Sequence, residues 1–192
     1  MSNKLSEKYR KEITPALREK FGYKNIYAVP KIEKIVINSG VGKIVNTRKA
    51  KVTAQSELGV IEDIIKEFAL ITGQNPQVIR ARKSISTFKL RKGMVSGIRV
   101  TLRGEKMYDF LSRLIDVAFP RTRDFRGIEE KSVDSSGNLS MGIREQIVFP
   151  EIPHDKVQYI WGMQVTVVTS AGRREEALEL FRQVGVPFSK QT

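Results

Sequence analysis

Hydrophobic residues recur at helical spacing in four stretches of the chain. The first stripe repeats every four residues and comprises Leu5, Tyr9, Ile13, Leu17 and Phe21. Thr14 and Pro15 interrupt this stripe, and such a pair is typical of an N-cap followed by the first residue of a helix. We therefore expect a second helix to begin at Thr14 and to end at Gly22.

Three further helices are predicted over residues 52–71, 105–119 and 175–184, where apolar residues lie three and four positions apart. We expect the first to be capped by Gly73 and the second to be stopped by Pro120. The side chains expected to face inward are Leu58, Ile61, Ile65 and Phe68 in the first, Met107, Phe110, Leu111, Leu114 and Ala118 in the second, and Ala177, Leu180, Phe181 and Val184 in the third.

Strands are predicted where β-branched residues cluster or alternate with polar residues. Such stretches cover residues 34–39, 77–86, 95–103 and 163–170. Residues 87–94 form a predicted hairpin loop, and the composition of residues 120–155 is typical of a loop-rich segment with short strands. The order of elements predicts an α+β fold in which helices pack on one face of an antiparallel or mixed sheet, within a single domain spanning the chain.

The alternation within the strands predicts that one face of the sheet stays open and polar. In residues 98–103, aliphatic side chains alternate with Arg99, Thr101 and Arg103. The polar positions of the other strands are Lys34, Asn38, Arg80, Arg82, Gln164 and Thr166. Such groups bind phosphate and sugar. Because this face lacks the aromatic pairs that stack single-stranded bases, it suits structured RNA, the alternative being an ordinary solvated sheet.

The charge of the chain is unevenly distributed. Among 192 residues, 34 Lys+Arg oppose 21 Asp+Glu, and the formal net charge is +13. Residues 74–106 hold nine basic groups and one acid, whereas residues 127–155 hold six acids and two basic groups. Because a merely solvated surface interleaves its signs, this polarity predicts two contact surfaces with different partners.

The composition excludes several kinds of chemistry. The chain has no cysteine and one histidine, His154, which excludes disulfides, thiolate zinc sites and multi-histidine metal sites. The polar N-terminus predicts no signal peptide, and no apolar run reaches the roughly 20 residues of a membrane span. Trp161, the single tryptophan, is interpreted as part of the core. We expect a cytoplasmic protein with no cofactor, metal, membrane partner or small-molecule substrate.

Candidate catalytic motifs are incomplete. Residues 38–43 are similar to a phosphate loop, but Ile37 and Ile44 occupy the places of the required glycine and hydroxyl residue. We instead expect Gly40 and Gly42 to form a tight turn at the end of the strand, which an RNA backbone could approach closely. The lone histidine and the acidic loop residues are interpreted as surface groups, and nothing assembles a nucleophile, a base and an orienting group.

A series of motifs spans nearly the whole chain in order. The segments are residues 30–42, 70–76, 81–85, 88–91, 97–104, 119–127, 142–152, 162–163 and 185–188. Together they resemble the family of the bacterial large-subunit ribosomal protein five. The set is specific to that family, although no single segment would be.

The resemblance implies a non-enzymatic ribosomal protein with several partners. It implies binding to 5S rRNA and its attachment to 23S rRNA in the central protuberance, a basic hairpin that contacts P-site tRNA, and a bridge to small-subunit ribosomal protein thirteen. The rRNA-binding residues implied are Lys34, Asn38, Ser39, Gly40, Gly42, Gln74, Arg99, Thr101 and Arg103. The tRNA-contacting residues implied are Arg80, Arg82, Lys83, Lys89, Arg91 and Lys92. The bridge residues implied are Arg121, Arg123, Asp124, Arg126, Glu129, Asp134 and Asn138.

The chain also departs from the family pattern. The segment between Gly42 and Leu70 is longer than is usual, Ser39 replaces a commoner Met, and residues 131–138 lack an aromatic and a basic residue of the pattern. Two other functional classes stay open from the sequence: a free-standing factor that binds structured RNA or assists ribosome assembly, and an enzyme that acts on RNA.

Overall fold

The computed structural model of the chain describes residues 4–42, 44, 54–88, 90–153, 155 and 157–189. Of the residues singled out in the sequence, Lys89 and His154 lie outside the described residues.

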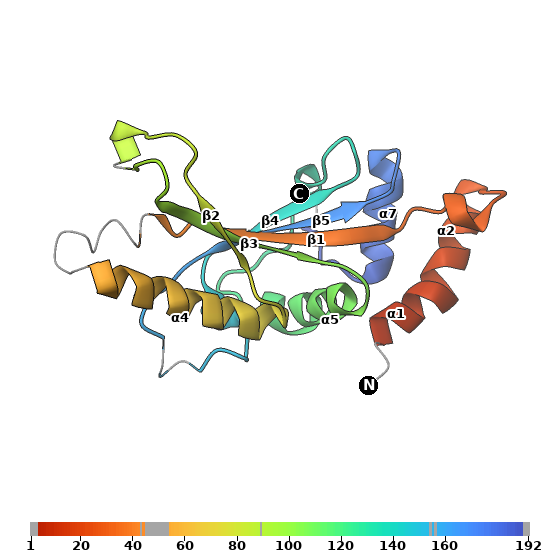
Figure 1. The fold of residues 1–192 in the computed structure, drawn as a ribbon. Coiled ribbons are helices and arrows are strands. Elements are labelled where there is room, and N and C mark those ends of the chain that lie inside the picture. Colours follow the sequence, from red (N-terminus) through yellow and green to blue (C-terminus); the bar gives the residue numbers. More distant parts are fainter. Residues whose placement is uncertain are drawn as a thin grey trace. The chain divides into compact units, whose positions relative to one another are not determined.

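A five-stranded antiparallel sheet with the strand order β2-β3-β1-β5-β4 forms the centre of the fold (Figure 1). The predicted α+β class is therefore confirmed. The strands are β1 (Ile32–Ser39), β2 (Gln77–Arg80), β3 (Val95–Leu102), β4 (Leu139–Ile143) and β5 (Met163–Thr169). β2 is shorter than the predicted strand over 77–86: its register with β3 shifts between Ile79 and Arg80, and the ladder ends at Arg80.

The helices occupy the predicted stretches. They are α1 (Lys4–Lys8), α2 (Thr14–Phe21), α4 (Ala54–Thr72), α5 (Glu105–Arg113), α6 (Phe119–Arg121) and α7 (Arg174–Val184). Short turns of 3-10 helix lie at Ile26–Ala28, Glu130–Ser132 and Gln146–Val148. Within the described residues, no helix is both long enough and apolar enough to cross a membrane.

The chain divides into two compact units. Unit 1 comprises Met1–Val36, Leu102–Met141 and Val165–Thr192, and unit 2 comprises Ile37–Thr101 and Gly142–Gln164. Each unit is described by itself below, and the single domain expected from the sequence stays a prediction.

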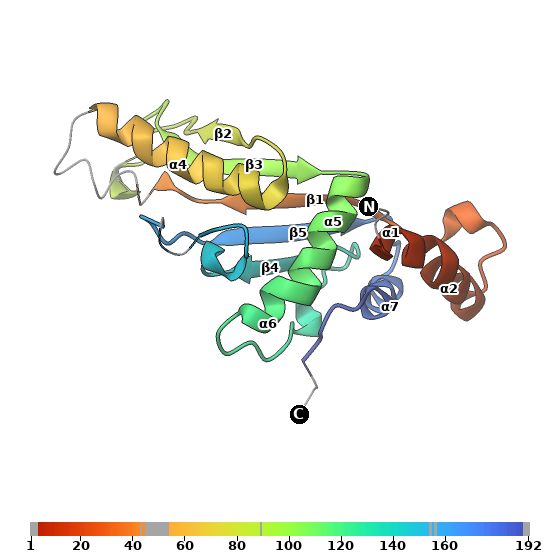
Figure 2. The same ribbon diagram turned by 90° about the horizontal axis from the view of Figure 1, so that it is seen from below.

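In unit 2, the long helix α4 lies along one face of β2 and β3 (Figure 2). Its buried side chains are Val60, Ile64, Phe68 and Ile71. Of the residues predicted to face inward, Phe68 is buried, whereas Ile61 and Ile65 are only half-buried. The cause is that α4 carries aliphatic residues on more than one side, so that spacing alone does not select the buried stripe.

In unit 1, α5 lies across the strands, and its predicted apolar face is confirmed (Figure 2). The buried residues of this helical stretch are Met107, Phe110, Leu111, Leu114 and Ala118. The predicted inward residues of α7, namely Ala177, Leu180, Phe181 and Val184, are buried as well. An ion pair of 2.8 Å between Lys20 and Glu179 joins α2 to α7, and the Lys20 ammonium holds the pKa of Glu179 below its ordinary value.

The second helix begins at Thr14 and ends before Gly22, as expected, but Thr14 is not an N-cap. Thr14 has helical angles, and its hydroxyl donates a 3.0 Å hydrogen bond to the carbonyl oxygen of Tyr9. A π-helical turn at Tyr9–Ile13 connects α1 to α2 without a break, and Leu114–Ala118 forms the same kind of turn before Pro120. In a π-helical turn each N–H bonds the carbonyl five residues before it, not four. The helix can therefore continue through a proline, which has no N–H to donate.

Candidate nucleic-acid interface

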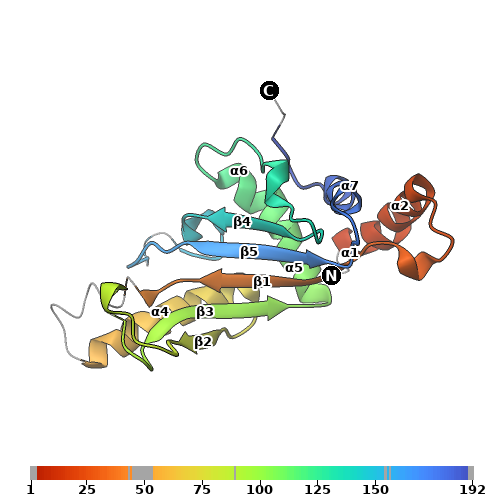
Figure 3. The same ribbon diagram turned by 90° about the horizontal axis from the view of Figure 1, so that it is seen from above.

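The polar face of unit 2 follows from the alternation of its strands. In β3, Ile98, Val100 and Leu102 are buried, whereas Arg99 is exposed and Thr101 is half-buried. Figure 3 shows the strands of this unit in front of α4, which covers their other side. We call this surface the unit 2 face, and it comprises Asn38, Gln77, Arg99, Thr101 and Gln164.

Arg99 is held in a defined orientation on this face. It pairs with Gln77 across the antiparallel strands, and its Nη2 donates a 3.1 Å hydrogen bond to Gln77 Oε1. A guanidinium anchored through one nitrogen still presents its other N–H groups to a phosphate. The pair therefore offers a charged donor whose position is partly fixed before any ligand binds.

Gln74 is positioned by the end of α4. Gly73 ends this helix with a φ angle of +65°, and its N–H donates a 2.8 Å hydrogen bond to the carbonyl oxygen of Ala69. The Thr72 hydroxyl donates a 2.9 Å hydrogen bond to the carbonyl oxygen of Gln74. The Gln74 side chain is exposed. The predicted helix cap thus fixes the backbone of a predicted site residue.

Ser39 does not lie on the unit 2 face. Its side chain is only 2% exposed, and its hydroxyl donates a 2.6 Å hydrogen bond to the carbonyl oxygen of Gly162. Because Ser39 alternates with the exposed Asn38, it points to the side that carries Ile35 and Ile37. The expected RNA contact of Ser39 is corrected accordingly: the hydroxyl serves packing between two segments of unit 2.

The backbone conformation does not require glycine at Gly40 or Gly42, and the approach of an RNA backbone to them stays a prediction. Neither Gly40 nor Gly42 has a positive φ angle, and an added Cβ at Gly40 would meet open space. A Cβ at Gly42 would lie 3.4 Å from the carbonyl oxygen of Ser96. The close approach that requires glycine occurs instead at Gly97 in β3, where a Cβ would lie 2.7 Å from the carbonyl oxygen of Ser39. Sequence reasoning did not find this position from the residues themselves.

The basic hairpin between β2 and β3 is closed by two pairs of backbone hydrogen bonds. Ala81 bonds Met94 and Gly93 at 2.8 and 2.9 Å, and Ile85 and Leu90 bond each other at 2.8 and 3.1 Å. Its exposed cations are Arg80, Arg82, Lys83, Arg91 and Lys92. Within the described part of the hairpin, no acidic residue accompanies them. The pairing therefore concentrates positive charge on one arm.

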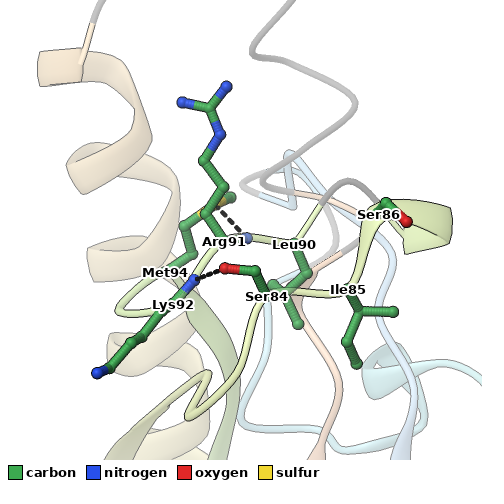
Figure 4. Close-up of a pocket in the computed structure, with 7 residues that line it drawn as sticks. All are labelled: Ser84, Ile85, Ser86, Leu90, Arg91, Lys92 and Met94. Atoms are coloured by element: carbon green, nitrogen blue, oxygen red, sulfur yellow. Dashed lines mark hydrogen bonds between the residues drawn. The ribbon is translucent and has the colours of Figure 1, made fainter.

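A cavity of about 920 Å³ lies on this hairpin (Figure 4). Ile85, Leu90 and Met94 supply its apolar part. The N–H of Lys92 donates a 3.0 Å hydrogen bond to the Ser84 hydroxyl, which fixes the two limbs of the arm at this level. Arg91 also lines the cavity, and its side chain points away from Ile85 and Leu90 in Figure 4. The cavity combines apolar contacts with adjacent cations.

Two predicted rRNA-binding residues belong to unit 1. Lys34 is half-buried in β1, and Arg103 is exposed directly after β3. Gly104 follows with a φ angle of +61° and precedes α5. In this unit the open side of β4 and β5 carries hydroxyl groups, and those of Ser140 and Thr166 lie 3.1 Å apart.

The segment expected to form a bridge carries charges of both signs. Arg121, Arg123, Asp124, Arg126 and Glu129 are exposed. Part of the acidity counted in the sequence is neutralised within unit 1, because Glu130 forms an ion pair with Arg182 and Glu129 forms one with Lys131. The negative charge that this segment presents to a partner is therefore smaller than the count in the sequence indicates.

Asp134 and Asn138 form an internal turn. The backbone N–H of Asn138 donates a 2.7 Å hydrogen bond to Asp134 Oδ1, and this bond holds the pKa of the Asp134 carboxyl below its ordinary value. The Asn138 amide oxygen accepts a hydrogen bond of 3.3 Å from the N–H of Thr169. The polar atoms of Asn138 thus stabilise the loop, while the carboxylate of Asp134 remains exposed.

Comparison with known families covers most of the chain. Residues 25–91 match the family described as Ribosomal protein L5, and residues 95–188 match the ribosomal L5P family C-terminus. The chain belongs to the ribosomal protein L5 family. It is therefore a protein of the large ribosomal subunit with an RNA partner, and it serves translation. Family membership weighs against a free-standing factor and against an enzyme, since this is a family of structural proteins of the ribosome.

The described part of this L5-family chain contains no cluster of three or more His, Cys, Asp or Glu that could hold a metal ion.

A buried polar network in unit 2 escaped sequence reasoning. Trp161 is 2% exposed, stacks on Phe68 with ring centroids 5.3 Å apart, and donates from Nε1 to Glu67 Oε2 at 2.7 Å. The fully buried Gln146 side chain donates to the same Glu67 oxygen at 3.3 Å and accepts from the backbone N–H of Trp161 at 2.9 Å. The core position of Trp161 is confirmed, but its partners are far away in sequence and no local pattern indicates them.

Proposed function

We propose that this L5-family protein binds 5S rRNA through the unit 2 face and helps to attach it to 23S rRNA. The observation that supports this most is the exposed Arg99, which Gln77 orients on a strand whose other side is buried. Asn38 and Thr101 add amide and hydroxyl groups. These groups bind phosphates and ribose hydroxyls, and the face has no aromatic pair for splayed bases.

The affinity is expected to come chiefly from phosphate contacts with release of counterions. If about six basic groups are engaged, the logarithm of the affinity should fall with the logarithm of the salt concentration with a slope of about −4 to −5. An affinity for 5S rRNA that hardly changes between low and moderate salt would contradict this account.

Replacing Arg99 by alanine is expected to weaken 5S rRNA binding by about 1–3 kcal/mol and to reduce the salt slope by about 1. The reason is the loss of a charged donor that Gln77 holds in place. Gel shifts with 5S rRNA and with a control RNA of equal length measure both effects. Arg10→Ala, which removes the same charge from an exposed position in unit 1, is the matched control. Equal affinity of the two variants would place the 5S site elsewhere.

The hairpin is proposed to contact P-site tRNA. Its support is the exposed, acid-free arm, on which Arg91 and Lys92 lie between the Ile85–Leu90 pair and the hydrogen bonds of Ala81. Lys89, which the resemblance also implies, lies outside the described residues.

Replacing Arg91 and Lys92 together by alanine is expected to leave the affinity for isolated 5S rRNA within about twofold, because these side chains lie on the arm and not on the unit 2 face. Retention of P-site tRNA on ribosomes that contain the variant should decrease, as measured by filter binding with labelled tRNA. Loss of 5S binding with unchanged tRNA retention would reverse this division of roles.

The segment from Arg121 to Gly142 is proposed to bridge to small-subunit ribosomal protein thirteen. Its support is the exposed set of charges that includes Arg123, Asp124 and Glu129, which lie on loops rather than in the sheet. Asp124 has a φ angle of 54°, an uncommon conformation for a residue other than glycine. Mixed charges on a loop surface suit a contact that is polar and reversible.

A further inference from the structure

A short exposed turn lies between α2 and β1 in unit 1, outside every surface assigned above. All residues from Lys24 to Ala28 are exposed, and Tyr27 is 89% exposed while Ile26 is 52% exposed. Single apolar residues on a surface need no explanation. Here, however, an aromatic and an aliphatic residue are adjacent on one turn. We call residues 24–28 the Tyr27 turn.

The Tyr27 turn is held by hydrogen bonds along its whole length. The Asn25 side chain accepts a 2.9 Å hydrogen bond from the N–H of Tyr27, and the Asn25 carbonyl accepts one of 3.1 Å from the N–H of Ala28. The Arg18 guanidinium in α2 donates to the carbonyl oxygens of Tyr23 and Lys24, at 3.2 and 3.3 Å. The segment leading into the turn is therefore tied to α2.

The segment leading out of the turn is anchored in the core. Val29 and Pro30 are buried, and the hydroxyl of the buried Tyr9 donates a 2.7 Å hydrogen bond to the Pro30 carbonyl oxygen. Burial raises the pKa of Tyr9, so that this hydroxyl keeps its proton. The ring of Tyr27 is thus presented to solvent by a backbone that is fixed on both sides.

A cavity of about 480 Å³ lies beside the turn. Pro15, Tyr23 and Ile26 contribute apolar surface to it, and Arg18 and Lys24 contribute positive charge. Glu19 is the one acid that lines it. The cavity thus has an apolar part and an excess of positive charge, beside an exposed aromatic ring.

We propose that the Tyr27 turn binds an unpaired nucleotide of RNA, with the base stacked on the Tyr27 ring and a phosphate near Lys24 and Arg18. Stacking on an aromatic ring tolerates any base, because every base has a π-face. A rigid ring loses little conformational entropy when it is covered. RNA is favoured over a protein partner because cations outnumber acids around the cavity and the chain as a whole carries a charge of +13.

All residues of this site belong to unit 1, whereas the residues of the unit 2 face belong to unit 2. The proposal therefore does not depend on what the unit 2 face binds. The two can also be tested independently, since Arg99 and Tyr27 are replaced in separate variants and belong to different units.

The test uses the full chain and an RNA octamer that carries one 2-aminopurine, whose fluorescence falls when the base stacks. We expect Tyr27→Ala to weaken octamer binding by about 5- to 150-fold and to abolish the quenching, since stacking contributes roughly that factor per base. Tyr27→Phe should keep the octamer affinity and the fluorescence quenching within about twofold of the wild type, because the aromatic ring remains. Leu70→Ala, which truncates another exposed apolar residue (56% exposed), is the matched control and should behave as the wild type.

Several outcomes would overturn the proposal. The first is that Tyr27→Ala binds the octamer with the same affinity as the wild type and quenches its fluorescence to the same extent. Another is reduced incorporation of Tyr27→Ala into ribosomal subunits with unchanged octamer binding, which would assign the turn to a protein partner. Gel shifts with intact 5S rRNA, run on Tyr27→Ala and Arg99→Ala in parallel, separate a failure at this turn from a failure at the unit 2 face.

Discussion

Replacing Trp161 by alanine is expected to lower the free energy of unfolding by about 3–5 kcal/mol, the usual cost of truncating a large buried aromatic residue. Trp161 is almost fully buried and stacks on Phe68 with the ring planes 16° apart. Truncation would remove these contacts and leave a cavity beside α4. It would also remove the indole donor that Glu67 accepts at 2.7 Å. A carboxylate that loses a donor in a partly buried site is costly to keep there.

Thermal unfolding followed by circular dichroism measures this effect, because the variant lacks the only tryptophan. For a chain of this length, the expected loss corresponds to a decrease in the melting temperature of roughly 6–20 °C. Trp161→Phe is the control: it keeps the stacking on Phe68 and loses only the N–H donor, so its cost should be about 1–3 kcal/mol. If alanine and phenylalanine were equally destabilising, the hydrogen bond and not the packing would hold this residue.

The helices show how far periodicity can predict burial. The inward residues of α5 and α7 were predicted correctly, because each of these helices has one apolar stripe and a polar remainder. In α4 the prediction was correct for Phe68, but it selected Ile61 and Ile65, whereas Val60 and Ile64 face the core. Because α4 has aliphatic residues on several sides, spacing predicts more than one possible buried face. Which of these faces is buried depends on where the sheet lies.

The N-terminal stripe shows a different limit. Residues such as Leu5 and Ile13 repeat every four positions, which drifts around a regular α-helix of 3.6 residues per turn. The π-helical turn at Tyr9–Ile13 compensates, and Leu5, Tyr9, Ile13 and Leu17 are all buried. The sequence contained this signal, in that the repeat is longer than a helical turn, but Thr14-Pro15 also matched a helix start.

In the candidate interface, the sequence predicts which residues face outward but not which residues touch each other. Alternation in β3 places Arg99 and Thr101 opposite the buried aliphatic residues, as the structure has them. The pairing of Arg99 with Gln77 depends on the register of two strands, which a hairpin of uncertain length does not fix. Likewise, the sequence predicts Glu130 as an unpaired surface charge, whereas in the structure it forms an ion pair with Arg182.

Ser39 and Gly97 illustrate why backbone proximity is the hardest property to predict. Ser39 stands in a motif that resembles an RNA-binding turn, yet its hydroxyl is buried against Gly162. Gly97 lies inside β3, where glycine ordinarily weakens the sheet. Glycine is needed there because a carbonyl oxygen of the neighbouring strand β1 leaves no room for a side chain. Only the three-dimensional pairing distinguishes this glycine from Gly40, which has open space around it.

Replacing Gly97 by alanine is therefore expected to destabilise the protein by about 2–3 kcal/mol, which corresponds to roughly 4–12 °C in the melting temperature. The new Cβ would lie 2.7 Å from the carbonyl oxygen of Ser39, and neither atom can move aside by a rotamer change, because the backbone fixes the position of both. β1 and β3 would have to separate, which would also disturb Asn38 and Arg99 on the unit 2 face. We expect the affinity for 5S rRNA to fall with the stability.

Gly40→Ala and Gly142→Ala are the matched controls, because neither glycine has a positive φ angle and neither added Cβ would meet an atom within 4 Å. Their stability should be unchanged or raised by up to about 1 kcal/mol, since alanine reduces the entropy of the unfolded chain. Urea unfolding followed by the fluorescence of Trp161, which lies in the same unit as all three glycines, compares them directly. A Gly97→Ala variant as stable as Gly40→Ala would mean that the two strands tolerate a methyl group between them, and the close approach of β1 and β3 would then not explain this glycine.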